Sequence, residues 1–314
     1  MKKQFSHGNS TFYIVVIILF LIAAGMGAAI YFHQRTSNGV SVTDGTSAED
    51  LQSDFKDLAS DDEIATMVKN LQDKILSLED AIKLADAAAN DTPGALTSPK
   101  NSTLKSQAQA EISRQVDGFG KLADVIANLK SLTSDQKTAI TSQIQADITE
   151  LNNLGTAIET DSSITATRVD VQTLLSKYKV YAVFMPKVYT LAALENANDV
   201  VSSLNQLAAK FSARIAQLES SGQDATNLTK ALIEMQTNLE GAQDKLKIAN
   251  DLLTGLVPEN YPANKGVIQS VQQSMADAKK SIDTVQTDAQ NISTLLKNSK
   301  VSASSSVSAL PLGN

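Results

Sequence analysis

The sequence predicts an all-α protein: one or more elongated antiparallel coiled-coil-like helical bundles, preceded by one N-terminal transmembrane helix. Three observations lead to this expectation. Residues 12–32 contain no charged side chain. Most of the following chain repeats apolar residues in steps of three and four, the spacing of a coiled-coil seam. The 314 residues include only 14 Gly and 6 Pro, and 4% are aromatic, a composition that suits long helices better than strands.

Residues 12–32 are long enough to cross a bilayer core of about 30 Å as a helix. Lys2 and Lys3 precede this run and no acidic residue does, so residues 1–11 are expected in the cytoplasm and the bulk of the chain outside. This topology predicts a single-pass protein of the cell membrane. The alternative is a cleaved signal peptide, with small residues at Gly25–Ala29 as the cleavage region and a secreted product. The apolar run continues beyond that region, which favours the anchor.

The predicted ectodomain is acidic and lacks cysteine. The first 35 residues hold three basic residues and no acidic one, which leaves 24 basic and 34 acidic residues, a net charge of −10, for the rest. Such a charge does not favour binding to nucleic acid or to anionic lipid. Without cysteine there is no disulfide and no thiol nucleophile, so the fold is expected to be stabilised by packing.

A stalk and a first helical region are expected after the membrane segment. Residues 33–46 are rich in Thr, Ser and Gly and are expected to be a flexible stalk. The first helical region, 47–161, has a short helix near 47–58 and three longer helices. Ser60 is expected to cap the first long helix, and Thr133–Gln136 form a capping-box pattern before the third. The seams predicted for the three long helices are Ile64, Val68, Leu71, Ile75, Leu78, Ile82 and Ala85; Leu104, Ala108, Ile112, Val116, Phe119, Leu122, Ile126 and Leu129; and Ile140, Ile144, Ile148, Leu151, Leu154 and Ile158.

A second helical bundle is expected over 162–298. Pro186 either begins a new helix or kinks a continuing one. Gly222 is expected to end the next helix in the left-handed conformation, and Asp224 to cap the one after it. Residues 299–314 are Ser-rich and are expected to be a disordered tail. The seams predicted downstream of Pro186 are Leu194, Ala197, Val201, Leu204, Ala208, Phe211, Ile215 and Leu218; Leu228, Leu232, Met235, Leu239, Ala242, Leu246, Ala249, Leu253 and Leu256; and Ile268, Val271, Met275, Ala278, Ile282, Val285, Ala289, Ile292 and Leu296.

The segment from residue 178 to residue 189 is unusual, because it holds four of the eight aromatic residues found after residue 36. One interpretation is a contact patch for a partner, because Tyr beside Lys suits partner or glycan contacts. That patch would consist of Tyr178, Tyr181, Lys187 and Tyr189. The alternative is a local aromatic core where helices cross near Pro186.

No catalytic, cofactor-binding or metal-binding residue is predicted. The two histidines, His7 and His33, flank the apolar run on opposite sides, so a histidine-based metal centre or a Ser-His-Asp triad is not expected in the ectodomain. Acidic pairs fall in first turns or on solvated helix faces. Gly118-Phe119-Gly120 lacks both the motif and the preceding strand of a phosphate-binding loop.

The stretch 178–187, taken with 261–265, resembles a pattern in uncharacterised anchored or secreted helical proteins of small-genome, host-associated bacteria. The resemblance covers about 130–300. It implies a helical ectodomain at the cell surface without a known activity, and no functional residue follows from it.

We therefore expect a membrane-anchored extracytoplasmic helical scaffold or interaction protein of the bacterial cell envelope, and not an enzyme. The expected partners are the membrane, through residues 12–32, and a protein or a second copy of the chain, through the helices. Nucleic acid is not expected. The alternative is a sensor-type or solute-binding helical ectodomain, which would need another membrane protein because only about 11 residues precede the membrane segment.

Overall fold

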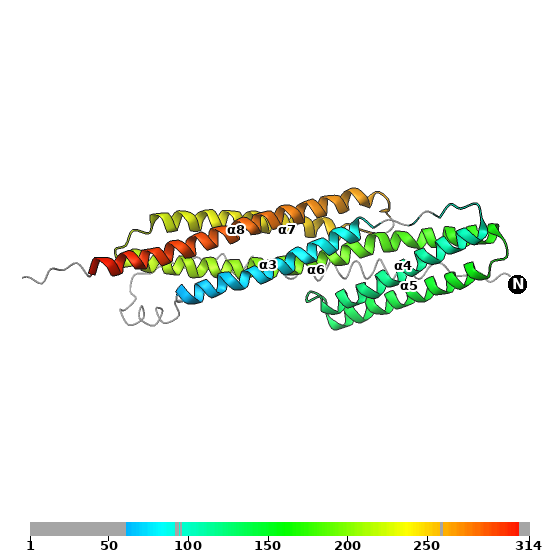
Figure 1. The fold of residues 1–314 in the computed structure, drawn as a ribbon, viewed down its shortest axis with the longest axis horizontal. Helices are drawn as coiled ribbons and strands as arrows, with labels where there is room; N and C mark the ends of the chain where they lie inside the picture. Colours follow the sequence, from blue (N-terminus) through cyan, green and yellow to red (C-terminus); the bar gives the residue numbers. More distant parts are fainter. Residues whose placement is uncertain (1–60, 92–93, 95, 258–259, 308–314) are drawn as a thin grey trace, which may run out of the picture. The chain divides into compact units, whose positions relative to one another are not determined.

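The computed structural model describes residues 61–91, 94, 96–257 and 260–307 and confirms the all-α class. These residues form six α-helices and no strand (Figure 1). Their bounds are α3 Asp61–Ala89, α4 Asn101–Asn128, α5 Ser134–Thr160, α6 Ile164–Ser220, α7 Thr226–Thr254 and α8 Asn264–Val307. None of these helices is long and apolar enough to span a bilayer. The predicted transmembrane helix at 12–32, the stalk at 33–46, the short helix near 47–58 and the Ser60 cap lie outside the described residues.

The chain divides into two compact units, and the division falls inside four of the helices. Unit 1 takes its described residues from Asp80–Glu195 and Ile248–Gln273. Unit 2 takes them from Asn38–Glu79, Asn196–Lys247 and Ser274–Asn314. This division differs from the expected regions 47–161 and 162–298, because each unit draws residues from both. Each unit combines helix segments that are distant in the sequence, and the order of the helices along the chain does not reveal this.

Unit 2 is a bundle of four helices that adjoin one another in a closed ring. Polar side chains mark each adjoining pair, α3 with α6, α6 with α7, α7 with α8, and α8 with α3. The marking contacts are Lys74 Nζ with Ser203 Oγ (2.6 Å), Thr229 Oγ1 with Glu219 Oε1 (3.2 Å), Asn238 Nδ2 with Asp288 Oδ2 (2.9 Å), and Gln286 with Gln72. This arrangement is that of a four-helix bundle, in which every helix turns one apolar stripe to the centre.

The predicted seams of α6, α7 and α8 are confirmed. Every residue predicted for these three seams is buried, from Leu194 to Leu218, from Leu228 to Leu256 and from Ile268 to Leu296. Burying one Leu or Ile contributes about 1.5–3 kcal/mol, and Ala contributes far less, so the many seam alanines bring the helices close without a large hydrophobic gain. In the earlier helices four predicted seam residues are only partly buried, Val68, Val116, Ile148 and Leu154, and the last three of them pack against the core of unit 1.

Unit 1 is built around the hairpin of α4 and α5 and the first half of α6. Gln109 Nε2 donates to the Gly155 carbonyl (2.6 Å), and Lys105 Nζ donates to the Glu159 carbonyl (2.7 Å), so α4 and α5 are antiparallel. An ion pair between Lys177 and Glu150 joins α5 to α6. The core of this unit is a cluster of apolar side chains from α3, α4, α5 and α6.

Three predicted helix boundaries have the expected contacts or backbone conformation. Thr133 accepts a hydrogen bond from the Gln136 N–H, and the Gln136 side chain accepts one from the Thr133 N–H (2.8 Å), the full capping box at the start of α5. Gly222 follows α6 with φ of 76°. The Asp224 carboxylate accepts a hydrogen bond from the Thr226 N–H (3.0 Å) at the start of α7.

Pro186 lies inside one continuous helix, because α6 runs unbroken from Ile164 to Ser220. A proline in a helix interior removes one backbone hydrogen bond and costs about 3 kcal/mol. The neighbouring side chains of Val183, Phe184, Met185 and Val188 are all buried, and their burial offsets that cost.

Helix α8 continues to Val307, beyond Ser299, where the disordered tail was expected to begin. The helix extends because no Gly or Pro stands between Ser299 and Val307; Pro311 is the next helix breaker in the sequence. Residues 308–314 of the predicted tail lie outside the described part of the chain.

Candidate functional site

The four residues of the predicted contact patch are core residues of unit 1. Their exposed fractions are 3% for Tyr178, 4% for Tyr181, 2% for Lys187 and 8% for Tyr189. The segment therefore forms a local aromatic core, as the alternative interpretation expected, and it offers no exposed surface to a partner. Tyr178 and Tyr181 share one polar cluster, whereas Lys187 lies further along α6 at a different contact.

Tyr178 and Tyr181 belong to a charged cluster centred on Arg114 of α4. Arg114 donates to both oxygens of Glu111, from Nε (3.0 Å) and from Nη2 (2.6 Å), and it also pairs with the Asp91 carboxylate after the end of α3. The Tyr178 hydroxyl donates to the Asp91 carbonyl (2.9 Å). We call Asp91, Glu111, Arg114, Tyr178 and Tyr181 the Arg114 cluster. It joins the end of α3 to α4 and α6.

Aromatic rings surround the guanidinium of Arg114. Its Cζ lies 5.2 Å from the ring centroid of Tyr181 and 5.8 Å from that of Tyr178, within the range of a cation–π contact. The Phe119 and Tyr181 rings meet edge to face at 5.3 Å, and the Tyr178 and Tyr261 rings do so at 6.2 Å. Tyr261 brings the turn between α7 and α8 to the same place.

Glu111 and Arg114 keep their charges at neutral pH. Burial by itself raises the pKa of Glu111, but hydrogen bonds from Arg114, Gln115 and the Gly94 N–H outweigh burial and hold that pKa below its ordinary value. Burial lowers the pKa of Arg114, and the bonds and charge of Glu111 raise it above its ordinary value. Burial raises the pKa of Tyr181 to about 12, so the hydroxyl remains a donor.

Lys187 makes a different contact at the end of α7. Its Nζ donates to the Leu256 carbonyl (3.1 Å), two residues beyond the last residue of α7. Burial lowers the pKa of Lys187 to about 8. The carbonyls at a helix end carry partial negative charge and lack partners within the helix, so they suit a buried ammonium.

Glu111 and Arg114 were not predicted as site residues, although the sequence held a signal for Glu111. A strict alternation of four and three from Leu104 passes through 108, 111, 115, 118 and 122, and all these residues are buried. The seam predicted from the apolar residues alone passes instead through Ile112 and Val116. Glu111 and Gln115 at seam positions therefore indicated a buried polar contact. Asp91, which pairs with Arg114, could not be found this way, because it lies outside the helix pattern.

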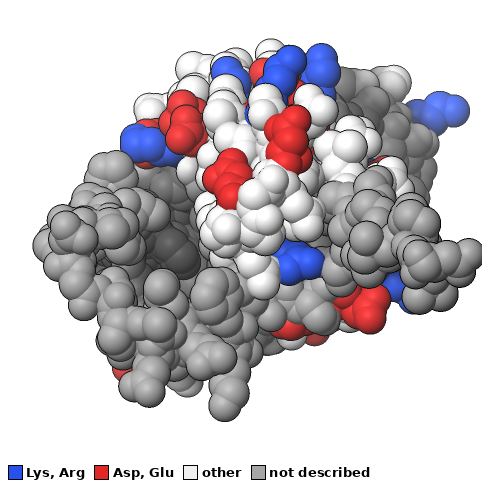
Figure 2. All heavy atoms as spheres, turned by 90° about the vertical axis from the view of Figure 1, so that its left-hand side faces the viewer, with Lys and Arg blue, Asp and Glu red and all other residues white. Residues whose placement is uncertain are grey.

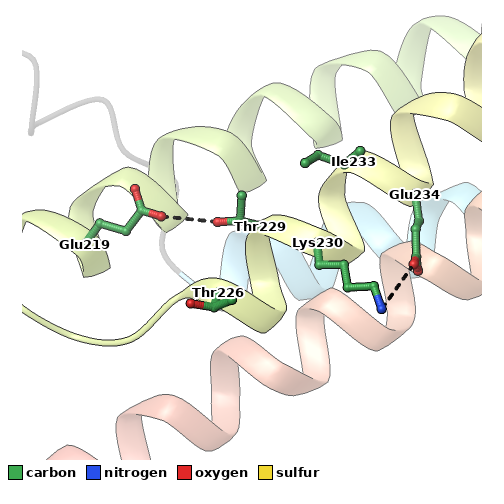
Figure 3. A pocket seen from close by; sticks show the side chains of 6 residues that line it. All are labelled: Glu219, Thr226, Thr229, Lys230, Ile233 and Glu234. Atoms are coloured by element: carbon green, nitrogen blue, oxygen red, sulfur yellow. Dashed lines mark hydrogen bonds and ion pairs between the residues drawn. The ribbon is translucent and has the colours of Figure 1, made fainter.

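Unit 2 has a shallow surface depression beside the turn between α6 and α7. It is lined by Glu219, Thr226, Thr229, Lys230, Ile233 and Glu234 (Figure 3). Thr229 donates to Glu219, Lys230 pairs with Glu234 at 3.9 Å, and Ile233 is 57% exposed. The polar side chains thus bond to one another across an open face. On the face seen in Figure 2, acidic and basic side chains of the described residues are interspersed among uncharged ones.

Asp147 of α5 gives unit 1 a specific pH dependence. Burial raises the pKa of this carboxyl to about 6, against the hydrogen bond from Gln143 (3.1 Å) and the charge of Lys177. The unfolded chain titrates near the ordinary 3.8, so the folded state binds this proton more tightly and gains stability as the pH falls from above 6 towards 4. We expect Asp147→Asn to raise the free energy of unfolding by about 1–3 kcal/mol at pH 7.5.

Urea unfolding at pH 7.5 and pH 5 measures this effect. The difference between Asp147→Asn and the wild type is expected to shrink at pH 5, where the wild-type carboxyl is already protonated. Asp117→Asn, at an exposed position of α4, is the matched control and is expected to change neither value. An equal gain at both pH values would contradict the assignment.

No family model matches this chain, and no curated protein and no solved structure is significantly similar to it. Among the described residues, no group of three or more His, Cys, Asp or Glu is placed to hold a metal ion.

Proposed function

We propose that the chain is a non-enzymatic scaffold or interaction protein of the bacterial cell envelope. Residues 12–32 would tether it to the membrane, and the helices would form an elongated antiparallel coiled-coil-like body outside the cell. The proposed protein thus combines the all-α fold described above with a membrane tether and a location in the cell envelope. The uncharged run at 12–32, preceded by Lys2 and Lys3, supports the tether and its direction.

The observation that carries the scaffold role is what the buried and partly buried charged groups bond to. Arg114 and Glu111 bond to each other, and Lys187 bonds to a backbone carbonyl. The Glu195 carboxylate accepts from the backbone N–H groups of Lys130 and Ser131, both at 2.7 Å. The contacts of Lys187 and Glu195, and the ion pair of Arg114 with Asp91, join one helix to another helix or turn. Contacts of this kind hold helices in place, as a scaffold requires.

Protease treatment of intact cells tests the proposal. The full chain, with an epitope after Asn314, is expressed in a bacterial host, and whole cells are treated with protease before and after lysis. We expect the epitope to be lost from intact cells while a cytoplasmic marker survives. The mass of the membrane-fraction protein should include residues 1–32. Protection of the epitope until lysis would overturn the proposed orientation, and a mass lacking those residues would overturn the tether.

A substitution within the apolar run provides the matched control. Leu19→Arg places a charge near the middle of residues 12–32, where it is expected to weaken insertion by about 2.5–3.5 kcal/mol. The variant should leave the membrane fraction and become resistant to external protease. A conservative Leu19→Ile substitution should leave both readouts unchanged.

Crosslinking in intact cells, followed by mass spectrometry, tests the interaction role. The tethered chain is expected to give reproducible crosslinks to an envelope protein or to a second copy of itself. Cells carrying the Leu19→Arg variant should lose these crosslinks. Crosslinks to cytoplasmic proteins alone would contradict the proposal.

A further inference from the structure

Four helices, α3, α4, α5 and α7, end in unit 1, and none of them has a basic residue in its own last turn. The last carbonyls of a helix lack partners within it and carry partial negative charge, which a nearby cation stabilises. At the ends of α4 and α5, a lysine from the neighbouring helix contacts these carbonyls. After α7, a lysine of α6 contacts the carbonyl of Leu256, two residues beyond the helix.

The contacts are reciprocal between α4 and α5. Lys137, in the first turn of α5, donates to the Ala127 carbonyl (2.9 Å) in the last turn of α4. Lys105, near the start of α4, donates to the Glu159 carbonyl (2.7 Å) and the Asp161 carbonyl (2.6 Å) at the end of α5. Each helix of the hairpin thus supplies a cation to the end of the other.

The third contact is the one that Lys187 makes from the middle of α6 to the end of α7. Its side chain is 2% exposed, so no bulk water competes for the Leu256 carbonyl. The next carbonyl, of Val257, accepts from the Asn264 side chain at the start of α8, and Asn264 is also buried. Successive carbonyls after α7 are therefore held by side chains from two different helices.

We propose that Lys105, Lys137 and Lys187 are positioning residues that cap helices other than their own, and so fix the turns after α5, α4 and α7. The common feature is geometric: an ammonium reaches unpaired carbonyls only where the neighbouring helix ends. A helix displaced along its axis would present carbonyls that are already bonded within the helix. Each lysine therefore favours the native lengths and alignment of the two helices that it joins.

Hydrogen exchange resolved by peptide tests this assignment. In Lys105→Met, the amides at the end of α5, residues 157–160, should exchange faster; in Lys137→Met, those at the end of α4, residues 125–128, should do so. An increase of about two- to fivefold corresponds to the contribution of a cation at a helix end. In Lys187→Met, the increase should appear at the end of α7, residues 251–256.

The location of the faster exchange in the chain decides between the outcomes. The faster exchange should lie on a different helix from the substitution, and arginine at 105 or 137 should restore protection because it keeps the positive charge. Lys121→Met, at an exposed position of α4, is the control and should change no helix end. Faster exchange only around the substituted residue, or uniformly along unit 1, would overturn the proposal. Lys105 and Lys137 are partly exposed, so these variants keep the test valid even if Lys187→Met fails to fold.

Discussion

Gly118→Ala is expected to destabilise the protein by about 1–3 kcal/mol, whereas Gly120→Ala, two residues away in the same helix, is expected to stabilise it by up to about 1 kcal/mol. The sign depends on what a methyl group would meet. A Cβ at 118 would lie 2.8 Å and 2.9 Å from ring carbons of Tyr181, and closer still to its hydroxyl. A Cβ at 120 would meet nothing within 4 Å and would only improve helix propensity.

Tyr181 cannot easily move away from a methyl group at 118. Phe119 packs against its ring, and Arg114 lies over it. Thermal and urea unfolding of both glycine variants measure the two signs. In a Tyr181→Leu background the penalty of Gly118→Ala should fall, which a double-mutant cycle detects. Two variants that both stabilise the protein would show that α4 and α6 do not approach each other at Gly118.

Arg114→Met is expected to lower the free energy of unfolding at pH 7 by about 2–3 kcal/mol. The substitution removes both hydrogen bonds to Glu111 and the ion pair with Asp91, and it leaves the Glu111 carboxylate only 4% exposed without its cation. Arg168→Met, at an exposed position of α6, is the control and should cost less than about 0.5 kcal/mol. Arg114→Lys should recover only part of the loss, since Lys cannot hold both carboxylate oxygens in one plane.

The pH dependence identifies the cause of the Arg114→Met loss. In the wild type the pKa of Glu111 is lowered, so this carboxylate adds stability above its unfolded pKa, and the contribution disappears as the pH falls through the folded pKa. Without Arg114, fewer hydrogen bonds oppose the effect of burial, which raises the pKa of Glu111, so this pKa should rise. The difference between variant and wild type should therefore shrink as the pH falls through the lowered pKa of Glu111. A difference that is constant with pH would assign the loss to packing instead.

The helices and their buried faces could largely be predicted, because the spacing of apolar residues indicates which face of each helix is buried. The seams of α7 and α8 are buried at every predicted position, and the capping box at Thr133 and the left-handed Gly222 lie where local chemistry places them. These features depend on interactions within a few residues. In α4 the predicted seam residue Val116 is only partly buried, although it packs against the core, and the polar residues Glu111 and Gln115 are buried beside the predicted seam.

The Arg114 cluster could be predicted only in part for a physical reason. Tyr178 and Tyr181 stood out by composition, but composition does not tell a surface from a core. Their burial follows from partners distant in sequence: Asp91, Arg114 and Tyr261 lie between about 60 and 90 residues away along the chain. The lysine contacts at helix ends also join residues distant in sequence, since Lys105 at the start of α4 contacts Asp161 after the end of α5, 56 residues later.

The sequence by itself determined the helical class, the buried face of most helices and several helix ends, because periodicity and capping are local properties of the chain. The tertiary structure decided that α6 continues through Pro186, that two units each draw on both of the expected helical regions, and that the tyrosines near Pro186 are core residues. These outcomes depend on which helices pack against each other. The free energy of that packing is a sum over side chains that lie far apart in the sequence.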